Sequence, residues 1–93
     1  MAVLMRSEIQ GVTAEQIRPF IAQANERMKS FPGFIAQAAG PIPGGYQVSE
    51  VWETQEAHER WVQEVVGPAT AQQLGMTEIP PVQYLPLDDF ITR

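Results

Sequence analysis

The chain contains no cysteine, only one histidine and only six basic residues among its 93. Without cysteine it can form neither disulfides nor thiolate metal clusters, and a lone histidine argues against a protein-only transition-metal site. We therefore expect no bound metal. The run GPIPGG has neither the spacing nor the following helix of a phosphate-binding loop, so flavin and nicotinamide sites are not indicated and we expect no cofactor. The six basic residues are scattered and the formal net charge is −5, so nucleic acid would meet net repulsion and no basic stripe.

Long hydrophobic runs are also missing. No apolar stretch approaches the roughly 20 residues that span a bilayer, so we expect no membrane partner. The beginning, MAVLMRSEIQ, lacks the basic segment and apolar run of a signal peptide, which favours a cytoplasmic location. The length and an apolar share of 44% predict a single domain over residues 1–93. A chain this short buries only about 60–65% of its unfolded surface, so association would add stability.

Four segments have the pattern of β-strands. Residues 2–9 form a short apolar run, and residues 34–39 a short run of mostly small side chains. Residues 46–52 alternate between two faces, and residues 82–87 follow a pair of prolines. The loop GPIPGG at residues 40–45 contains glycines that can adopt positive φ, which predicts a hairpin between the two middle strands.

Two helical regions lie between these strands. Thr13, with a glutamine three residues later, has the pattern of a capping box, and apolar side chains then recur every three or four residues. Proline disfavours a helix interior, so this helix begins either after Thr13 or at Arg18–Pro19. The second helix has Thr54 as its cap. We expect Gly67–Pro68 to interrupt it before a short helical piece over residues 69–75.

The resulting order is strand, helix, strand, strand, helix, strand. This order predicts an α+β, ferredoxin-like fold, in which a four-stranded antiparallel sheet carries both helices on one face. The other face of such a sheet would remain open. We therefore expect two copies to pack through their sheets as a homodimer.

The segment AAGPIPGGYQVSEVWETQEAHERWV resembles small members of the dimeric α/β-barrel superfamily, including the antibiotic-biosynthesis-monooxygenase type. The shared signature is two glycines, an aromatic residue, and then x-V-x-acid-V-W-E-[ST]. The likeness is strongest over residues 38–68, and the element order extends it along the chain. The resemblance implies a dimeric α/β barrel. It does not select a reaction, because the superfamily includes cofactor-free oxygenases, polyketide cyclases, haem-degrading enzymes, haem peroxidases and proteins with no known reaction.

The haem-degrading branch can be tested residue by residue. It uses an asparagine on the first strand, a tryptophan ending the third and a histidine two to three turns into the next helix. The matching positions in this sequence are Ser7, Trp52 and Trp61 or Val62. Only the tryptophan is retained, and His58 lies about one turn too early. The resemblance therefore argues against haem ligation.

Two titratable residues are candidate catalytic groups. His58 could move a proton at neutral pH, or it could simply pack where relatives carry a phenylalanine-like ring. Glu50 lies mid-strand on the same face as Trp52, and a carboxylate buried there would have a raised pKa and could act as acid or base. Alternatively it forms a structural ion pair, for example with Arg6, or a dimer contact.

Further residues are candidates for the wall of a substrate pocket. Aromatic rings suit a flat ligand, and an amide within a strand of small residues could face it. These substrate-binding candidates are Trp52, Trp61, Tyr46, Gln37, Phe20 and Phe34. The tryptophans equally suit a core, and Tyr46 and Tyr84 could each donate a hydrogen bond to a ligand carbonyl.

Two functions from different classes stay open. The first is a small cofactor-free enzyme, of monooxygenase or cyclase type, acting on a hydrophobic, aromatic or polyketide-like molecule. The second is a non-catalytic homodimeric module for ligand binding or assembly. An enzyme should present Glu50 or His58 to a pocket, whereas a module should pair these groups and fill the space with tryptophan.

Overall fold

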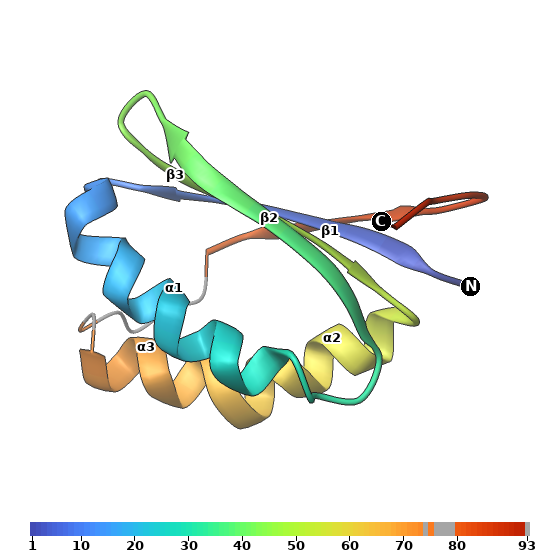
Figure 1. Cartoon of the computed structure of the whole chain (residues 1–93). Coiled ribbons are helices and arrows are strands. Elements are labelled where there is room, and N and C mark those ends of the chain that lie inside the picture. Colours follow the sequence, from blue (N-terminus) through green and yellow to red (C-terminus); the bar gives the residue numbers. More distant parts are fainter. Residues whose placement is uncertain (74, 76–79, 93) are drawn as a thin grey trace.

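The computed structural model describes residues 1–73, 75 and 80–92. Its elements, in chain order, are β1 (Val3–Gln10), α1 (Ala14–Met28), β2 (Phe34–Ile42), β3 (Gly45–Trp52), α2 (Gln55–Trp61), the π-helical segment η1 (Val62–Val66), α3 (Gly67–Gln73) and β4 (Val82–Pro86). The strands pair in the order β2-β3-β1-β4, with every pair antiparallel. All helices lie on one face of the sheet (Figure 1), so the predicted ferredoxin-like fold is confirmed.

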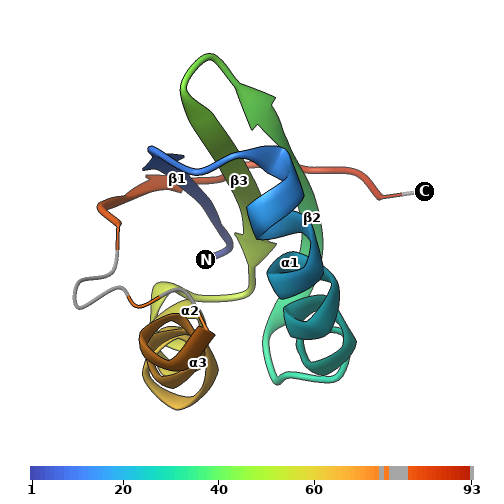
Figure 2. The same ribbon diagram turned by 90° about the vertical axis from the view of Figure 1, so that its left-hand side faces the viewer.

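The helices form two parallel rows beneath the sheet. Seen from the side, α1 occupies one row, and the α2–η1–α3 run occupies the other (Figure 2). In the part of the chain that the structure describes, no helix is both long and apolar enough to cross a bilayer. None of the described helices lies on the opposite face of the sheet.

The β2–β3 hairpin is tighter than predicted. The loop expected over residues 40–45 shrinks to a turn, because β2 continues through Pro41 to Ile42. Proline cannot donate to a ladder, but β2 is an edge strand, where one missing donor is tolerated. Gly44 has a φ of +77° and supplies the positive φ that the turn requires.

Helix α1 begins after Thr13, and the alternative start at Arg18–Pro19 is wrong. The Thr13 hydroxyl accepts from the Gln16 amide at 3.2 Å, and the Gln16 side chain accepts from the Thr13 amide at 2.9 Å. This capping box offsets the hydrogen bond lost at Pro19. Pro19 is exposed, so water can take the place of that bond.

The expected interruption at Gly67–Pro68 does not occur. The chain passes from α2 through η1 into α3, and the Gly67 amide bonds to the Val62 carbonyl, five residues back. This wider turn opens the hydrogen-bond ladder just before Pro68, which could not donate to it. The predicted end of the third helical piece falls partly on residue 74, which lies outside the described residues; α3 ends at Gln73.

The core lies between the sheet and the helices. It is formed by residues from both layers: Met5, Ile17, Phe20, Met28, Tyr46, Val48, Trp52, Trp61 and Val65. Strand register also places four side chains in one row across the sheet. Gln37 pairs with Glu50, Glu50 with Met5, and Met5 with Tyr84. This row forms the sheet side of the candidate site.

Candidate functional site

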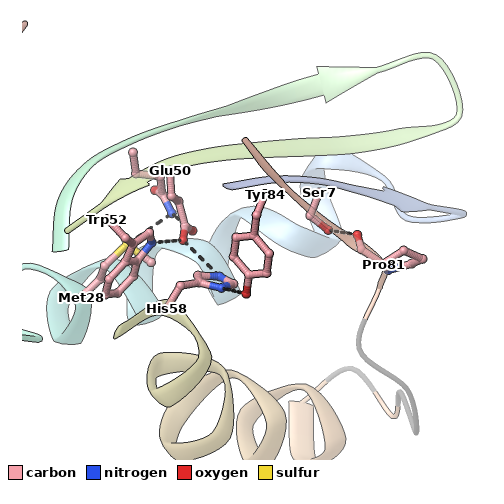
Figure 3. Close-up of polar contacts among 8 residues, drawn as sticks. Ser7, Met28, Glu50, Trp52, His58, Pro81 and Tyr84 are labelled. Carbon is pink, nitrogen blue, oxygen red and sulfur yellow. Dashed lines mark hydrogen bonds and ion pairs between the residues drawn. The ribbon is translucent and has the colours of Figure 1, made fainter. Parts of the chain in front are cut away.

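Glu50 is a carboxyl buried in the middle of β3. It is only 4% exposed and faces the helices. The Trp52 indole donates to Oε1 at 2.8 Å, and the Gln37 amide donates to Oε2 at 3.1 Å (Figure 3). Burial raises the pKa of Glu50 above its ordinary value, although the hydrogen bonds from Trp52 and Gln37 oppose the increase. The group is therefore a stronger base than an exposed glutamate.

His58 reaches this carboxyl from α2. The helix is fixed at its start by Thr54, whose hydroxyl accepts from the Ala57 amide at 3.1 Å. His58 is 1% exposed, and its Nε2 lies 3.6 Å from Oε1 of Glu50. Burial lowers the pKa of His58 to about 4, so the imidazole is neutral at pH 7.

Tyr84 completes the chain of polar groups. Its hydroxyl lies 2.7 Å from Nδ1 of His58 (Figure 3). Burial, together with the negative charges of Glu59 and Glu50, raises the pKa of Tyr84. The phenol therefore stays protonated at neutral pH. The sequence indicated Tyr84 as a donor to a ligand or as a structural residue at a strand end, and it did not indicate the contact with His58, because that contact depends on the pairing of β4 with β1.

A mostly apolar cavity of about 90 Å³ adjoins this chain. Both candidate catalytic residues line it, together with three of the six predicted wall residues: Gln37, Phe20 and Trp61. The remaining lining comes from the sheet, from α1, from the second helical row and from the segment before β4: Met5, Ser7, Ile9, Ile21, Ala24, Met28, Val48, Val62, Val66, Thr70, Pro80 and Val82. The structure therefore brings Glu50 and His58 together at one wall.

The other three predicted wall residues are not among the lining. Tyr46 is buried at the opposite end of β3 from Trp52. Trp52 is fully buried among rings, with Phe31 at 6.1 Å and Phe34 at 5.5 Å between centroids. Trp52 thus contributes to the site through its hydrogen bond to Glu50.

The structural alternative for Glu50, an ion pair with Arg6, is not formed. Met5 is the residue of β1 opposite Glu50, and Arg6 is paired with Ser49. Because side chains alternate along a strand, Arg6 lies on the other face of the sheet, where it is exposed. The titratable side chain beside Glu50 is instead His58, whose Nε2 lies 3.6 Å from Oε1 and whose ring is neutral at pH 7.

A metal site is not evident in the described residues. Among residues 1–73, 75 and 80–92, no three histidine, cysteine, aspartate or glutamate side chains come together as metal ligands do. Both ring nitrogens of His58 face protein groups, Glu50 on one side and Tyr84 on the other. The imidazole is therefore engaged within the protein rather than presented to a haem iron.

No known family profile and no curated protein matches the sequence. Solved structures do match it over nearly the whole chain. The structural-genomics protein YJCS has a TM-score of 0.74 at 15% identity, over 95% of this chain and 100% of that chain. A candidate antibiotic biosynthesis monooxygenase from Bordetella bronchiseptica has a TM-score of 0.72 at 18% identity, over 92% and 96% of the two chains.

A third match is a variant of SnoaB, a cofactor-independent oxygenase from Streptomyces nogalater. Its TM-score is 0.64 at 14% identity, over 99% of this chain and 96% of that chain. The protein has the fold of the antibiotic-biosynthesis-monooxygenase-like proteins. The sequence resemblance is thus confirmed at the level of the fold. At 14–18% identity no reaction is transferred from these structures.

Proposed function

We propose that this protein is a small cofactor-free enzyme, of monooxygenase or cyclase type, that removes a proton from a hydrophobic molecule at Glu50. The observation that carries this proposal is the presence of Glu50 and His58 together at the wall of an otherwise largely apolar cavity. A buried carboxylate with a raised pKa is a suitable general base. The likeness of fold to a cofactor-independent oxygenase adds support.

In the oxygenase version the substrate supplies the electrons. Glu50 takes a proton from a phenol or from a CH₂ group beside a carbonyl, and the resulting anion adds molecular oxygen. The peroxide anion that forms takes the proton back from Glu50 and becomes a hydroperoxide. Loss of water from the hydroperoxide leaves a new carbonyl, so one O₂ gives one C=O and one H₂O. The protein contributes the base and a mostly apolar cavity around it.

In the cyclase version no oxygen is consumed. The same deprotonated carbon attacks a carbonyl of the same molecule, and the proton on Glu50 returns to the new alkoxide. The protein then acts chiefly by holding the chain in a reactive shape. Oxygen uptake therefore separates the two reaction types.

The size of the cavity favours a small substrate. Its volume of about 90 Å³ is well below the ~300–1,000 Å³ of pockets for drug-sized ligands. Even a benzene ring occupies engineered cavities of about 150 Å³, so binding must widen the space. Phenolic or enolisable molecules with one or two rings fit this requirement better than polycyclic ones.

The alternative is a non-catalytic homodimeric module for ligand binding or assembly. It is favoured by the saturation of the polar groups: both oxygens of Glu50 accept hydrogen bonds, and both nitrogens of His58 face partners. In such a module, the sole role of the network would be to satisfy the hydrogen-bonding needs of buried polar atoms. In that case substitution would affect stability and no reaction would be found.

The first experiment measures oxygen uptake and quinone formation with phenol, 1-naphthol and anthrone, which contain one, two and three rings. Each would consume one O₂ and release one water. We expect the protein to convert at least one of these three compounds. Glu50→Gln should then lower kcat by about 100-fold or more, as loss of a general base does. The matched control is Glu53→Gln, which removes an exposed carboxylate from the residue just after the same strand.

Two results would count against the oxygenase version. One is the absence of turnover with every probe, and the other is equal rates for the Glu50→Gln and Glu53→Gln variants. The cyclase type needs a separate probe with two carbonyls on one flexible chain, such as a 1,5-diketone, and its ring closure without oxygen uptake would identify that type. If none of the three probes is converted but one quenches tryptophan fluorescence, the binding module becomes the better description.

A further inference from the structure

We propose that Tyr84 is a positioning residue of this site: its hydroxyl donates to Nδ1 of His58 and holds the imidazole as the tautomer whose Nε2–H faces Glu50. The two distances that define this arrangement are 2.7 Å from the Tyr84 oxygen to Nδ1 and 3.6 Å from Nε2 to Oε1 of Glu50. Figure 3 shows the three side chains in one line, from strand β4 across helix α2 to strand β3.

The direction of the Tyr84–His58 hydrogen bond follows from acidity. A neutral imidazole has one N–H donor and one bare nitrogen acceptor. A phenol, with an ordinary pKa of about 10, is a far stronger donor than a neutral imidazole N–H and a weaker acceptor than a bare ring nitrogen. The distance of 2.7 Å is typical of a hydroxyl donor. Nδ1 therefore accepts, and the ring proton is on Nε2.

The side chains packed around the ring support the same direction of the hydrogen bond, from the Tyr84 hydroxyl to Nδ1 of His58. Glu50 faces His58 from β3, Tyr84 faces it from β4, and the Trp52 ring lies edge-on at 5.6 Å between centroids. Burial, and then the negative charges of Glu59 and Glu50, raise the pKa of the Tyr84 phenol and keep it protonated. A protonated phenol remains a donor over the whole neutral range.

The geometry also restrains the ring physically. Tyr84 packs edge-on against His58 at 5.4 Å and 75°, and Trp52 does so at 5.6 Å and 70°. The imidazole is thus clamped between two aromatic side chains, with its nitrogens directed along the line of polar groups. Rotation of the ring would break the contact with both Tyr84 and Glu50.

This tautomer makes the two oxygens of Glu50 unequal. Oε1 faces two donors, the Trp52 indole and Nε2–H of His58, whereas Oε2 receives one donor, the Gln37 amide. The oxygen with fewer donors retains the more available lone pair. If Glu50 is the base of the proposed function, on which this step rests, Oε2 is the atom that takes the substrate proton.

The test uses the fact that the chain contains one histidine. The two ring nitrogens of ¹⁵N-labelled protein can be observed at pH 7 by long-range proton–nitrogen NMR without ambiguity. We expect the wild type to show a protonated Nε2 and an unprotonated, hydrogen-bonded Nδ1. Tyr84→Phe should shift the Nδ1 signal and mix the tautomers. Tyr46→Phe, which removes the other tyrosine hydroxyl of the chain, should leave both signals unchanged.

The wild-type spectrum alone can overturn the proposal. A proton on Nδ1 would mean that His58 donates to Tyr84, and the assignment would be wrong even if the Tyr84→Phe variant failed to fold. Equal ring signals in the wild type and a folded Tyr84→Phe variant would also contradict it.

Activity gives a second readout once a substrate is found. Tyr84→Phe should lower kcat about tenfold with little change in KM, which corresponds to the loss of one orienting hydrogen bond. The NMR result does not depend on turnover. Failure of the tautomer assignment and failure of the proposed reaction are therefore distinguishable.

Discussion

Glu50 and His58 are 4% and 1% exposed, and burial moves the pKa of each toward the neutral form. The two groups have opposite effects on how the free energy of unfolding depends on pH. The unfolded chain protonates His58 below pH 6.5 and the folded chain only below about 4, so stability falls as pH decreases through that window. The pKa of Glu50 is raised above 4.5, so its contribution falls as pH rises from 4.5 to its folded value.

The His58→Phe variant isolates the contribution of His58 to the pH dependence of the free energy of unfolding. A pKa lowered from 6.5 to about 4 should cost the wild type about 2 kcal/mol of unfolding free energy between pH 7 and pH 5. The variant lacks this loss, so its change over the same interval should be smaller by that amount. Urea denaturation at the two pH values measures the difference. A wild type that loses less than the variant would show instead that His58 ionises in partnership with Glu50.

At the scale of elements, the position of His58 depends on how the α1–β2 connection packs against α2. Gly33 lies in this connection with a φ of +91°, and its carbonyl accepts from the Glu53 amide at 2.8 Å. A Cβ added at Gly33 would lie 2.5 Å from the Cβ of Ala57, the residue before His58. The close approach of the connection to α2 therefore requires glycine at this position.

We predict that Gly33→Ala is markedly destabilising, and that Gly11→Ala is the matched control. Gly11 also has a positive φ, of +80°, but a Cβ there would meet nothing within 4 Å. Both substitutions incur backbone strain of about 1–2 kcal/mol. The clash with Ala57 should add about 1–3 kcal/mol at Gly33 alone. Equal losses in chemical denaturation would show that α2 moves freely away from the connection.

At the scale of the whole molecule, the face of the sheet opposite the described helices has two distinct ends. Strand register places Ala36, Val51, Leu4 and Leu85 in an apolar row across all four strands. Toward the other end the same face carries polar residues of β1, β3 and β4: Arg6, Glu8, Gln10, Gln47 and Gln83. An apolar row beside a polar region is the arrangement that self-association of two sheets would use.

We therefore predict that the protein is a homodimer through this face and that Leu4→Arg converts it to a monomer. A charge in the apolar row would be buried without a partner on association, whereas it stays solvated in the single chain. Sedimentation equilibrium of the two proteins gives the masses. The control is Gln23→Arg, which places the same charge on the exposed side of α1. A wild type that sediments as a monomer at all concentrations would refute the dimer.

The sequence by itself determined the element order, and with it the ferredoxin-like fold. These features are local. Alternation along residues 46–52 places Glu50 and Trp52 on one face, and the capping box at Thr13 sets the start of α1. The same local periods placed Glu50 and His58 among the candidates, because a carboxylate and an imidazole at positions expected to be buried can be recognised from spacing alone.

The tertiary structure decided how these residues meet. Tyr84 comes to the site through the pairing of β4 with β1, strands at opposite ends of the chain, and no local period encodes that register. Gln37 comes to Glu50 through the β2–β3 hairpin, whose register is set by a turn shorter than the loop that the sequence predicted. Packing around Phe31 and Phe34 fills the space beside Trp52, so this ring supports Glu50 and does not line the cavity. The π turn before Pro68 keeps the second helical row continuous, because a wider turn tolerates the missing donor at a smaller loss of packing than a break would.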